Sequence, residues 1–134
     1  MKVEGSCHCG QVTFEADIDP DAVRICHCTD CQTLTGSVYR VTAETPAASF
    51  VLRSGSPKIY IKTAESGNKR AQAFCSNCGT PIYAADPREP RTYGIRVGTL
   101  KQRSELRPTR QIWYRSALPW VTDIRAVPQV ERQR

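Results

Sequence analysis

Seven cysteines in a chain of 134 residues constrain this protein more than any other feature of its sequence. An odd number of cysteines cannot all pair as disulfides, and the first ten residues lack the apolar core of a signal peptide. The sequence therefore predicts a cytoplasmic protein, and thiols are kept reduced in that compartment. Metal binding, rather than a disulfide framework, is the role that we expect for these cysteines.

The cysteines fall into short groups whose spacings suit a metal. Cys75 and Cys78 form a C-x-x-C pair, and the following Gly79 can supply the positive φ of a turn that aims both sulfurs at one point. Cys7 and Cys9 are two residues apart, and in an extended segment such side chains point the same way. We expect these four thiolates to hold one closed, tetrahedral structural zinc, with each sulfur about 2.3 Å from the metal.

Cys26, Cys28 and Cys31 remain, and they are close enough in sequence to converge on a second zinc. Three protein ligands leave one coordination position open, which is typical of a catalytic zinc. The alternative is a closed structural site in which His27 or His8 supplies the fourth ligand, although an extended backbone would point His27 away from its neighbours. An iron–sulfur cluster is disfavoured because the spacings do not match those of common ferredoxins.

Short β-branched or aromatic runs between turn residues predict a mainly β domain of short antiparallel strands. Val12, Phe14 and Ala16 alternate with polar residues, so they should line one buried face. The expected strands are residues 11–16, 38–41, 50–52, 58–62, 71–74, 81–84, 93–97 and 111–114.

One short helical turn is expected within the second cysteine group. Thr29 and Asp30 can cap this turn, and Gly36 ends it. Residues 1–126 should form a single domain, because no change in composition marks a boundary. Residues 127–134 are largely polar and should form a loose C-terminal tail.

The composition narrows the range of partners. A net charge of +6, from 19 basic and 13 acidic residues, favours an anionic partner or simply a solvated basic surface. The basic residues are dispersed and do not alternate with aromatic residues, which disfavours nucleic-acid binding. The chain has no run of about 18 apolar residues that would predict a membrane span. Trp113, Tyr114 and Trp120 are expected in the core rather than in a substrate pocket.

The cysteine motifs resemble those of the glutathione-dependent formaldehyde-activating enzymes, whose domain is shared with centromere protein V. The resemblance runs from Gly5 to about Val121, nearly the whole chain. Its specific stretches are Gly-Ser-Cys-His-Cys-Gly from residue 5, Cys-His-Cys with Cys31, and Phe-Cys-Ser-Asn-Cys-Gly-Thr-Pro-Ile-Tyr from residue 74. Softer matches lie in residues 98–100 and 112–120.

This resemblance implies a zinc-stapled, β-rich fold, sometimes called a β-tent, and two zinc ions in each chain. The implied reaction is the addition of glutathione, a small thiol, to formaldehyde, a small aldehyde, which gives S-hydroxymethylglutathione and is classed with the carbon–sulfur lyases. The structural zinc would lie on Cys7, Cys9, Cys75 and Cys78, and a more labile zinc would lie on the catalytic residues Cys26, Cys28 and Cys31.

Two residues depart from the family pattern: Lys101 stands where an acidic residue is common, and Gln111 stands where a histidine is common. Glutamine cannot act as a general base near neutral pH, so a histidine's contribution would be missing. Glutathione carries two carboxylates, and Lys69, Arg70 and Arg96 are candidates to bind them. The competing interpretation is a non-catalytic, zinc-stapled module with an anionic or protein partner. The oligomeric state stays open, with a homodimer as one option.

Overall fold

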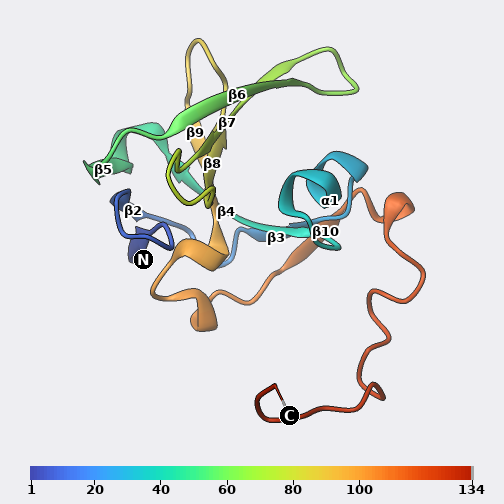
Figure 1. Ribbon diagram of the computed structural model, residues 1–134. Coiled ribbons are helices and arrows are strands. Elements are labelled where there is room, and N and C mark those ends of the chain that lie inside the picture. Colours follow the sequence, from blue (N-terminus) through green and yellow to red (C-terminus); the bar gives the residue numbers. More distant parts are fainter. Residues whose placement is uncertain (134) are drawn as a thin grey trace.

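The computed structural model describes residues 1–133, which form two β-sheets and one short α-helix (Figure 1). The mainly β fold expected from the sequence is therefore confirmed. A three-stranded sheet has the order β1-β2-β5, and a seven-stranded sheet has the order β10-β3-β4-β9-β8-β7-β6. The elements are β1 (Lys2–Ser6), β2 (Thr13–Asp17), β3 (Val23–Cys26), α1 (Thr29–Thr35), β4 (Arg40–Pro46), η1 (Ala47–Ser49), β5 (Val51–Ser54), β6 (Lys58–Thr63), β7 (Lys69–Phe74), β8 (Pro81–Ala85), β9 (Thr92–Arg96), η2 (Val97–Thr99), η3 (Arg103–Glu105), β10 (Arg110–Ile112) and η4 (Tyr114–Ser116).

The small sheet begins with an antiparallel hairpin whose connecting loop carries the first two cysteines. The face predicted to be buried is confirmed, since Val12, Phe14 and Ala16 are 2%, 2% and 5% exposed. Gly5 lies opposite Phe14 in the register of β1 and β2. A Cβ at Gly5 would lie 2.1 Å from Cζ of the Phe14 ring, so only glycine allows the ring to lie flat over β1.

The large sheet has one apolar face, which packs against the small sheet. Val23, Ala43 and Ile95 follow one another across β3, β4 and β9, and cross-strand partners point to the same face of a sheet. All three are fully buried and belong to the same hydrophobic cluster as Val3 and Phe14. The core therefore lies between the two sheets.

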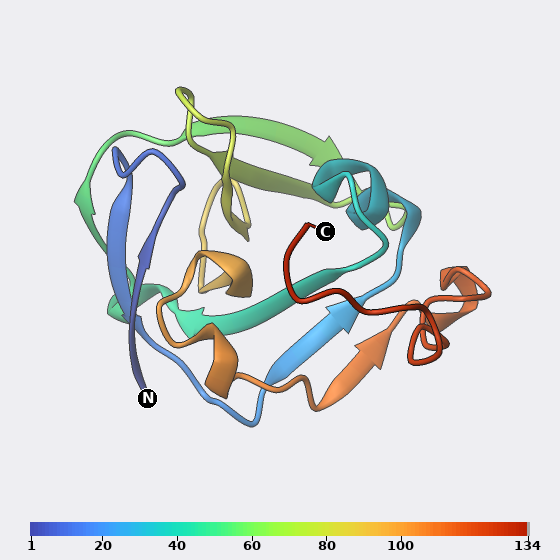
Figure 2. The same cartoon turned by 60° about the horizontal axis from the view of Figure 1, so that its bottom comes forward.

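The opposite face of the large sheet is polar. Cys26 on β3 lies across from Arg40 on β4, and Thr42 lies across from both Arg24 and Arg96. Alternation along β4 places Arg40 and Thr42 on the same face. Cys26, the first cysteine of the second group, therefore shares a sheet face with several basic side chains. Helix α1 follows β3 and lies next to the end of this strand (Figures 1 and 2).

Helix α1 begins at a cysteine rather than at the predicted cap. Cys28 is the N-cap residue, and its Sγ accepts a hydrogen bond from the backbone N–H of Cys31 at 3.3 Å. The prediction that Thr29 and Asp30 cap the helix is therefore wrong, because the sulfur takes the position of the capping oxygen. The predicted end of the helix is confirmed, since Gly36 has a φ of 61° and its backbone N–H donates to the carbonyls of Gln32 and Thr33 in the last turn.

Strands β1 and β3 were not predicted. The two inward positions of β1 are Val3 and Gly5, so one of them has no side chain to signal burial. Strand β3 spans only four residues and ends inside a cysteine motif. It pairs in parallel with β10, an addition to the otherwise antiparallel ladders that Figure 2 shows as two adjacent arrows.

The three late aromatic residues are on the surface, so their assignment to the core is wrong. Trp113, Tyr114 and Trp120 are 41%, 53% and 53% exposed. They follow β10, which is the outermost strand of the large sheet, and no further layer of the described residues covers this edge. Trp113 also has a φ of 54°, a left-handed conformation that is unusual for a bulky residue.

The chain after η4 leaves the sheets, as Figure 1 shows for its red end. Residues 122–133 are exposed and contain turns but no strand or helix. The expected tail begins within this stretch, and its last residue, 134, lies outside the described residues. No helix among the described residues has the length and apolar character that crossing a membrane requires.

Candidate metal sites

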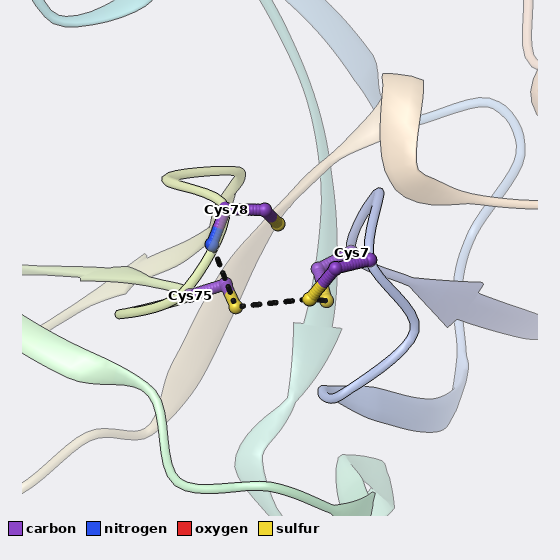
Figure 3. Close-up of side chains that lie close together, drawn as sticks. Cys7, Cys75 and Cys78 are labelled. Atoms are coloured by element: carbon purple, nitrogen blue, oxygen red, sulfur yellow. Dashed lines mark hydrogen bonds between the residues drawn. The ribbon is translucent and has the colours of Figure 1, made fainter.

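Four sulfurs gather where the loop after β1 meets the turn between β7 and β8 (Figure 3). The Sγ atoms of Cys7, Cys9, Cys75 and Cys78 all lie within 4.8 Å of one another. Two of the separations are 3.6 Å, from Cys7 to Cys9, and 3.8 Å, from Cys9 to Cys75. Four thiolates at about 2.3 Å from a tetrahedral zinc lie about 3.8 Å apart. A disulfide needs about 2.05 Å, so the cluster suits a metal and no pair is bonded.

Each loop of this cluster turns so that a backbone N–H points at a sulfur. Val12 donates to Sγ of Cys7 at 3.2 Å, and Cys78 donates to Sγ of Cys75 at 3.5 Å. Gly79 closes the second turn with a φ of 78°, as its place after the C-x-x-C pair predicts, and its N–H bonds the Cys75 carbonyl at 2.8 Å. These two sulfurs therefore each accept a hydrogen bond from a backbone N–H within their own loop.

Hydroxyl and amide groups lower the pKa of two of these thiols. The hydrogen bond from the Thr80 hydroxyl, 3.2 Å from Sγ of Cys78, lowers the pKa of that thiol to about 5. The side chain of Asn77 likewise lowers the pKa of Cys9. His8 stays outside the cluster and places its backbone N–H 3.1 Å from Oγ1 of Thr80. The four sulfurs therefore form a donor set that needs no histidine.

The remaining three cysteines form a second cluster at the junction of β3 and α1. The Sγ atoms of Cys26, Cys28 and Cys31 lie within 4.8 Å of one another, and no histidine, aspartate or glutamate of residues 1–133 joins them. The hydrogen bond from Cys26 lowers the pKa of Cys31 to about 5, and the charge of Arg40 acts in the same direction. The same hydrogen bond raises the pKa of Cys26. One thiolate and one thiol therefore share a proton in the metal-free cluster.

His27 lies between Cys26 and Cys28 in the sequence, but its side chain contacts β10 rather than the three sulfurs. Its side chain is fully buried, and its Nε2 lies 2.7 Å from Oε1 of Gln111 on β10. The rings of Tyr39 and Tyr114 pack edge-on against the imidazole, with centroids at 5.5 Å and 5.3 Å. Neither ring nitrogen belongs to the sulfur cluster, so the alternative of a closed site completed by His27 gains no support.

Two cavities are lined by a residue of the second cluster or by the strand partner of one. One, of about 370 Å³, is lined by Cys28 together with Trp113, Lys62 and Arg115. Trp113, assigned to the core by sequence, is therefore a cavity residue, and the Arg115 guanidinium lies 4.9 Å from its ring centroid. This position could not be read from the sequence, because it depends on the left-handed backbone at Trp113.

The other cavity, of about 410 Å³, lies on the polar face of the large sheet. Of the three basic residues proposed to meet a carboxylate, Arg96 lines it, whereas Lys69 and Arg70 do not. Arg40 also lines this cavity, and sequence reasoning missed it because only the strand register brings it beside Arg96. Thr35 and Thr80 contribute hydroxyl groups to the same wall.

A two-sheet β fold with one four-cysteine and one three-cysteine cluster defines a small β protein with two sites that could hold a metal ion. A family model described as "Glutathione-dependent formaldehyde-activating enzyme" matches residues 2–116. The chain belongs to this family, as the cysteine motifs predict.

Known proteins similar to this chain carry related names. A Halomonas elongata protein named "Putative glutathione-dependent formaldehyde-activating enzyme" is 33% identical over 67% of this chain, and the match spans 60% of that protein's length. A Schizosaccharomyces pombe protein named as an uncharacterized lyase is 28% identical over 73% of this chain and 68% of its own length. A crystal structure of a Rhodobacter sphaeroides protein, 20% identical, superposes with a TM-score of 0.62 over 81% of this chain and 98% of that one, which shows a common fold.

The two departures from the family pattern have structural partners. Lys101 forms an exposed ion pair with Glu4 of β1, at 3.0 Å. Gln111 accepts the hydrogen bond of the buried His27. The contact of Lys101 lies on the surface of the small sheet. The contact of Gln111 holds His27, which lies between Cys26 and Cys28 of the three-cysteine cluster.

Proposed function

We propose that this protein is a zinc-dependent enzyme of the carbon–sulfur lyase type that adds a thiol such as glutathione to formaldehyde or a related small aldehyde. The observation that carries the proposal is the three-cysteine cluster, which no fourth protein ligand among residues 1–133 completes. Structural zinc sites are closed by four protein ligands, whereas catalytic sites keep one position for water or substrate. The family membership of the chain supports the same reaction.

In this proposal Cys7, Cys9, Cys75 and Cys78 hold a structural zinc, and Cys26, Cys28 and Cys31 hold the second, catalytic one. When bound, the second zinc would supply a soft Lewis acid at which a thiol of pKa about 8.5 binds as its thiolate. Cys31 would be available as a thiolate ligand for this zinc at neutral pH, because its pKa is lowered to about 5.

The residues around the cluster hold the two reactants together. One cavity is lined by Cys28 of the cluster and the other by Arg40, the strand partner of Cys26, so that they can take the thiol and the aldehyde. The thiolate sulfur attacks the carbonyl carbon, a C–S bond forms, the C=O π bond breaks, and the oxygen takes a proton from water. Holding both partners removes the entropic cost of their encounter.

The chain supplies no obvious base for this addition at the position where the family commonly has a histidine. Gln111 does not accept a proton near neutral pH, and its amide oxygen is already bonded to His27. We expect this protein to turn over more slowly than relatives with a histidine at that position. A slower addition remains compatible with the proposed reaction, because a zinc ion held by Cys26, Cys28 and Cys31 would itself favour the ionised form of the thiol substrate.

The proposal also includes the bounds of the catalytic domain. The family match ends at residue 116 and the exposed stretch begins at residue 122, which supports one catalytic domain within residues 1–126. A reducing, cytoplasmic setting would keep all seven thiols free for metal.

The experiment combines zinc counting with a direct rate measurement. Native mass spectrometry should find two zinc ions per chain, and exchange NMR with ¹³C-formaldehyde and glutathione should show faster formation of S-hydroxymethylglutathione than in buffer. Cys28→Ser should lose one zinc and the acceleration, whereas the surface variant Lys101→Ala should keep both. Two bound zinc ions without acceleration, or a Cys28→Ser variant as active as the parent, would reject the enzyme and favour a zinc-stapled binding module.

A further inference from the structure

Two guanidinium groups on the polar face of the large sheet take no part in the addition step described above. Arg40 on β4 and Arg96 on β9 are diagonal neighbours, because Thr42 pairs with Arg96 and lies two residues from Arg40. Diagonal neighbours on one face lie roughly 7 Å apart, within reach of long side chains. The Arg96 guanidinium is held by Oγ1 of Thr42 at 3.1 Å and by Oε1 of Gln72 at 2.8 Å, both neutral acceptors.

Neither group has a carboxylate partner in the described part of the chain, and the negative charge on which Arg40 acts is the Cys31 thiolate. Arg40 is 4% exposed, and the Nε atoms of both Arg40 and Arg96 are buried without a hydrogen-bond partner. Among residues 1–133, no carboxylate lies within ion-pair distance of either side chain. Arg24, on the same face of the same sheet, shows the contrast, since Oε1 of Glu44 lies 3.1 Å from its Nη1.

Two largely buried positive charges without a carboxylate partner are unusual, because taking a charge out of water is costly unless enough opposite charge compensates. Burial and the charge of Arg40 lower the pKa of Arg96 to about 9. Filling the cysteine cluster does not remove the imbalance. Three thiolates and one divalent zinc carry a net charge of −1, whereas the two guanidinium groups carry +2.

Both side chains line the 410 Å³ cavity, which is much larger than formaldehyde requires and within the range of sites for larger organic ligands. Thr35 and Thr80 place hydroxyl groups around the same space. Guanidinium forks match the two oxygens of a carboxylate better than they match any neutral group.

We propose that Arg40 and Arg96 together bind one carboxylate of a small organic ligand in this cavity. The inference deepens the proposed function and rests on it for the identity of the ligand. The carboxylate belongs either to the thiol, as in glutathione, or to the aldehyde, as in glyoxylate. In both cases the pair orients the reactant against the three-cysteine cluster, because Arg40 lies directly across from Cys26 in the ladder of β3 and β4.

Binding tests the inference without the reaction. S-methylglutathione carries both carboxylates and no free thiol, so its titration by calorimetry requires no thiolate bond to zinc. If the carboxylate belongs to the thiol, Arg40→Met and Arg96→Met should each weaken this binding roughly 10- to 100-fold, which corresponds to the loss of a charge-assisted hydrogen bond. If it belongs to the aldehyde, the same loss should be found in the binding of glyoxylate instead. The matched control Arg24→Met, on the same sheet face but with its own carboxylate partner, should bind like the parent. The diethyl ester of S-methylglutathione should bind the parent as weakly as the acid binds Arg40→Met.

A second readout is thermal stability without ligand. In the zinc-loaded protein, Arg40→Met removes buried positive charge in excess of that of the cysteine cluster and keeps most of the side-chain volume, so its Tm should rise above that of the parent. Arg24→Met leaves Glu44 without its partner and should not raise the Tm. An Arg40→Met variant that is destabilised and still binds both S-methylglutathione and glyoxylate like the parent would assign Arg40 a purely structural role.

Reaction rates with different thiols and aldehydes show which of the two reactants carries the bound carboxylate. If the thiol supplies it, Arg40→Met slows the reaction of glutathione with formaldehyde but not that of cysteamine; if the aldehyde supplies it, only glyoxylate is affected. Equal binding of S-methylglutathione, its ester and glyoxylate to the parent and both arginine variants would overturn the inference. Carboxylate binding without any aldehyde addition would reject the proposed function alone, and aldehyde addition that is insensitive to both arginines would reject the carboxylate site alone.

Discussion

Nε2 of His27 lies 2.7 Å from Oε1 of Gln111, and this contact joins the loop after β3 to β10 beside the three-cysteine cluster. An amide oxygen only accepts hydrogen bonds, so Nε2 carries the imidazole proton and Nδ1 is left buried without a partner. The backbone N–H of His27 also bonds the Ile112 carbonyl at 3.1 Å. Cys26 and Cys28, on either side of this histidine, are therefore positioned by a residue that stays outside the sulfur cluster.

Removing the acceptor should destabilise the fold. Gln111→Leu leaves the buried N–H of His27 without a partner, and such a loss costs about 1–3 kcal/mol in free energy of unfolding. Gln111→Glu keeps an acceptor oxygen and is the matched control. Urea unfolding of the zinc-loaded proteins measures both. Equal stability of Gln111→Leu and the parent would mean that the contact contributes nothing to the fold in solution.

Gly5 tests the packing of the small sheet. In Gly5→Ala the new methyl group would lie 2.1 Å from Cζ of Phe14, whose ring stacks on Phe50 with centroids 5.2 Å apart. Overpacking of this kind typically costs about 1–3 kcal/mol in stability. Gly98→Ala, which would meet no atom within 4 Å, should have little effect. If urea denaturation gave the two variants the same midpoint, the close approach of Phe14 to β1 would be wrong.

The two cysteine clusters should differ in their contribution to folding. Cys75 is buried in the core at 1% exposure, and its cluster ties the loop after β1 to the turn after β7. Structural zinc in small domains contributes apparent free energies of about 10–16 kcal/mol. Cys75→Ser should therefore lose cooperative thermal unfolding, whereas Cys28→Ser should lose one zinc and keep a folded core. Circular dichroism with zinc analysis tests this, and equal loss of structure in both variants would contradict it.

The alternation of Val12, Phe14 and Ala16 was sufficient to predict a buried strand face, because a hydrophobic period of two fits the pleat of a strand and not the 3.6-residue turn of a helix. The grouping of the cysteines also followed from the sequence, since a turn glycine and two-residue spacings are local properties. Gly36 and Gly79 adopt the positive φ values that their positions indicate.

What could not be predicted depends on contacts between distant segments. The Arg40 and Arg96 pair exists only through the register of β4 and β9, which no local pattern fixes. Trp113 and Trp120 have the side chains of core residues, yet they lie past the outermost strand of the sheet, where no further layer of the described chain buries them. The sequence therefore predicted the grouping of the cysteines better than it predicted the surroundings of the second cluster.

The proton that Cys26 and Cys31 share in the second cluster leads to a final prediction. After mild chelation has removed the labile zinc, Cys31 should react with iodoacetamide across neutral pH, because its pKa is lowered to about 5 and only the thiolate is alkylated. Its labelling should fall as the pH drops through about 5, where the thiolate is protonated. Cys26, whose pKa is raised by the same hydrogen bond, should stay unlabelled at neutral pH.

Trypsin can cleave after Arg24 and Arg40, so one peptide, residues 25–40, carries all three cysteines, and tandem mass spectrometry can locate the modified sulfur. Cys28, which lies on the same peptide, is the internal reference. Labelling of Cys26 ahead of Cys31, or Cys31 labelling that rises only near pH 9, would show that the proton is not shared as the geometry indicates. Selective labelling of Cys31 would identify it as the sulfur that is ionised before the metal binds.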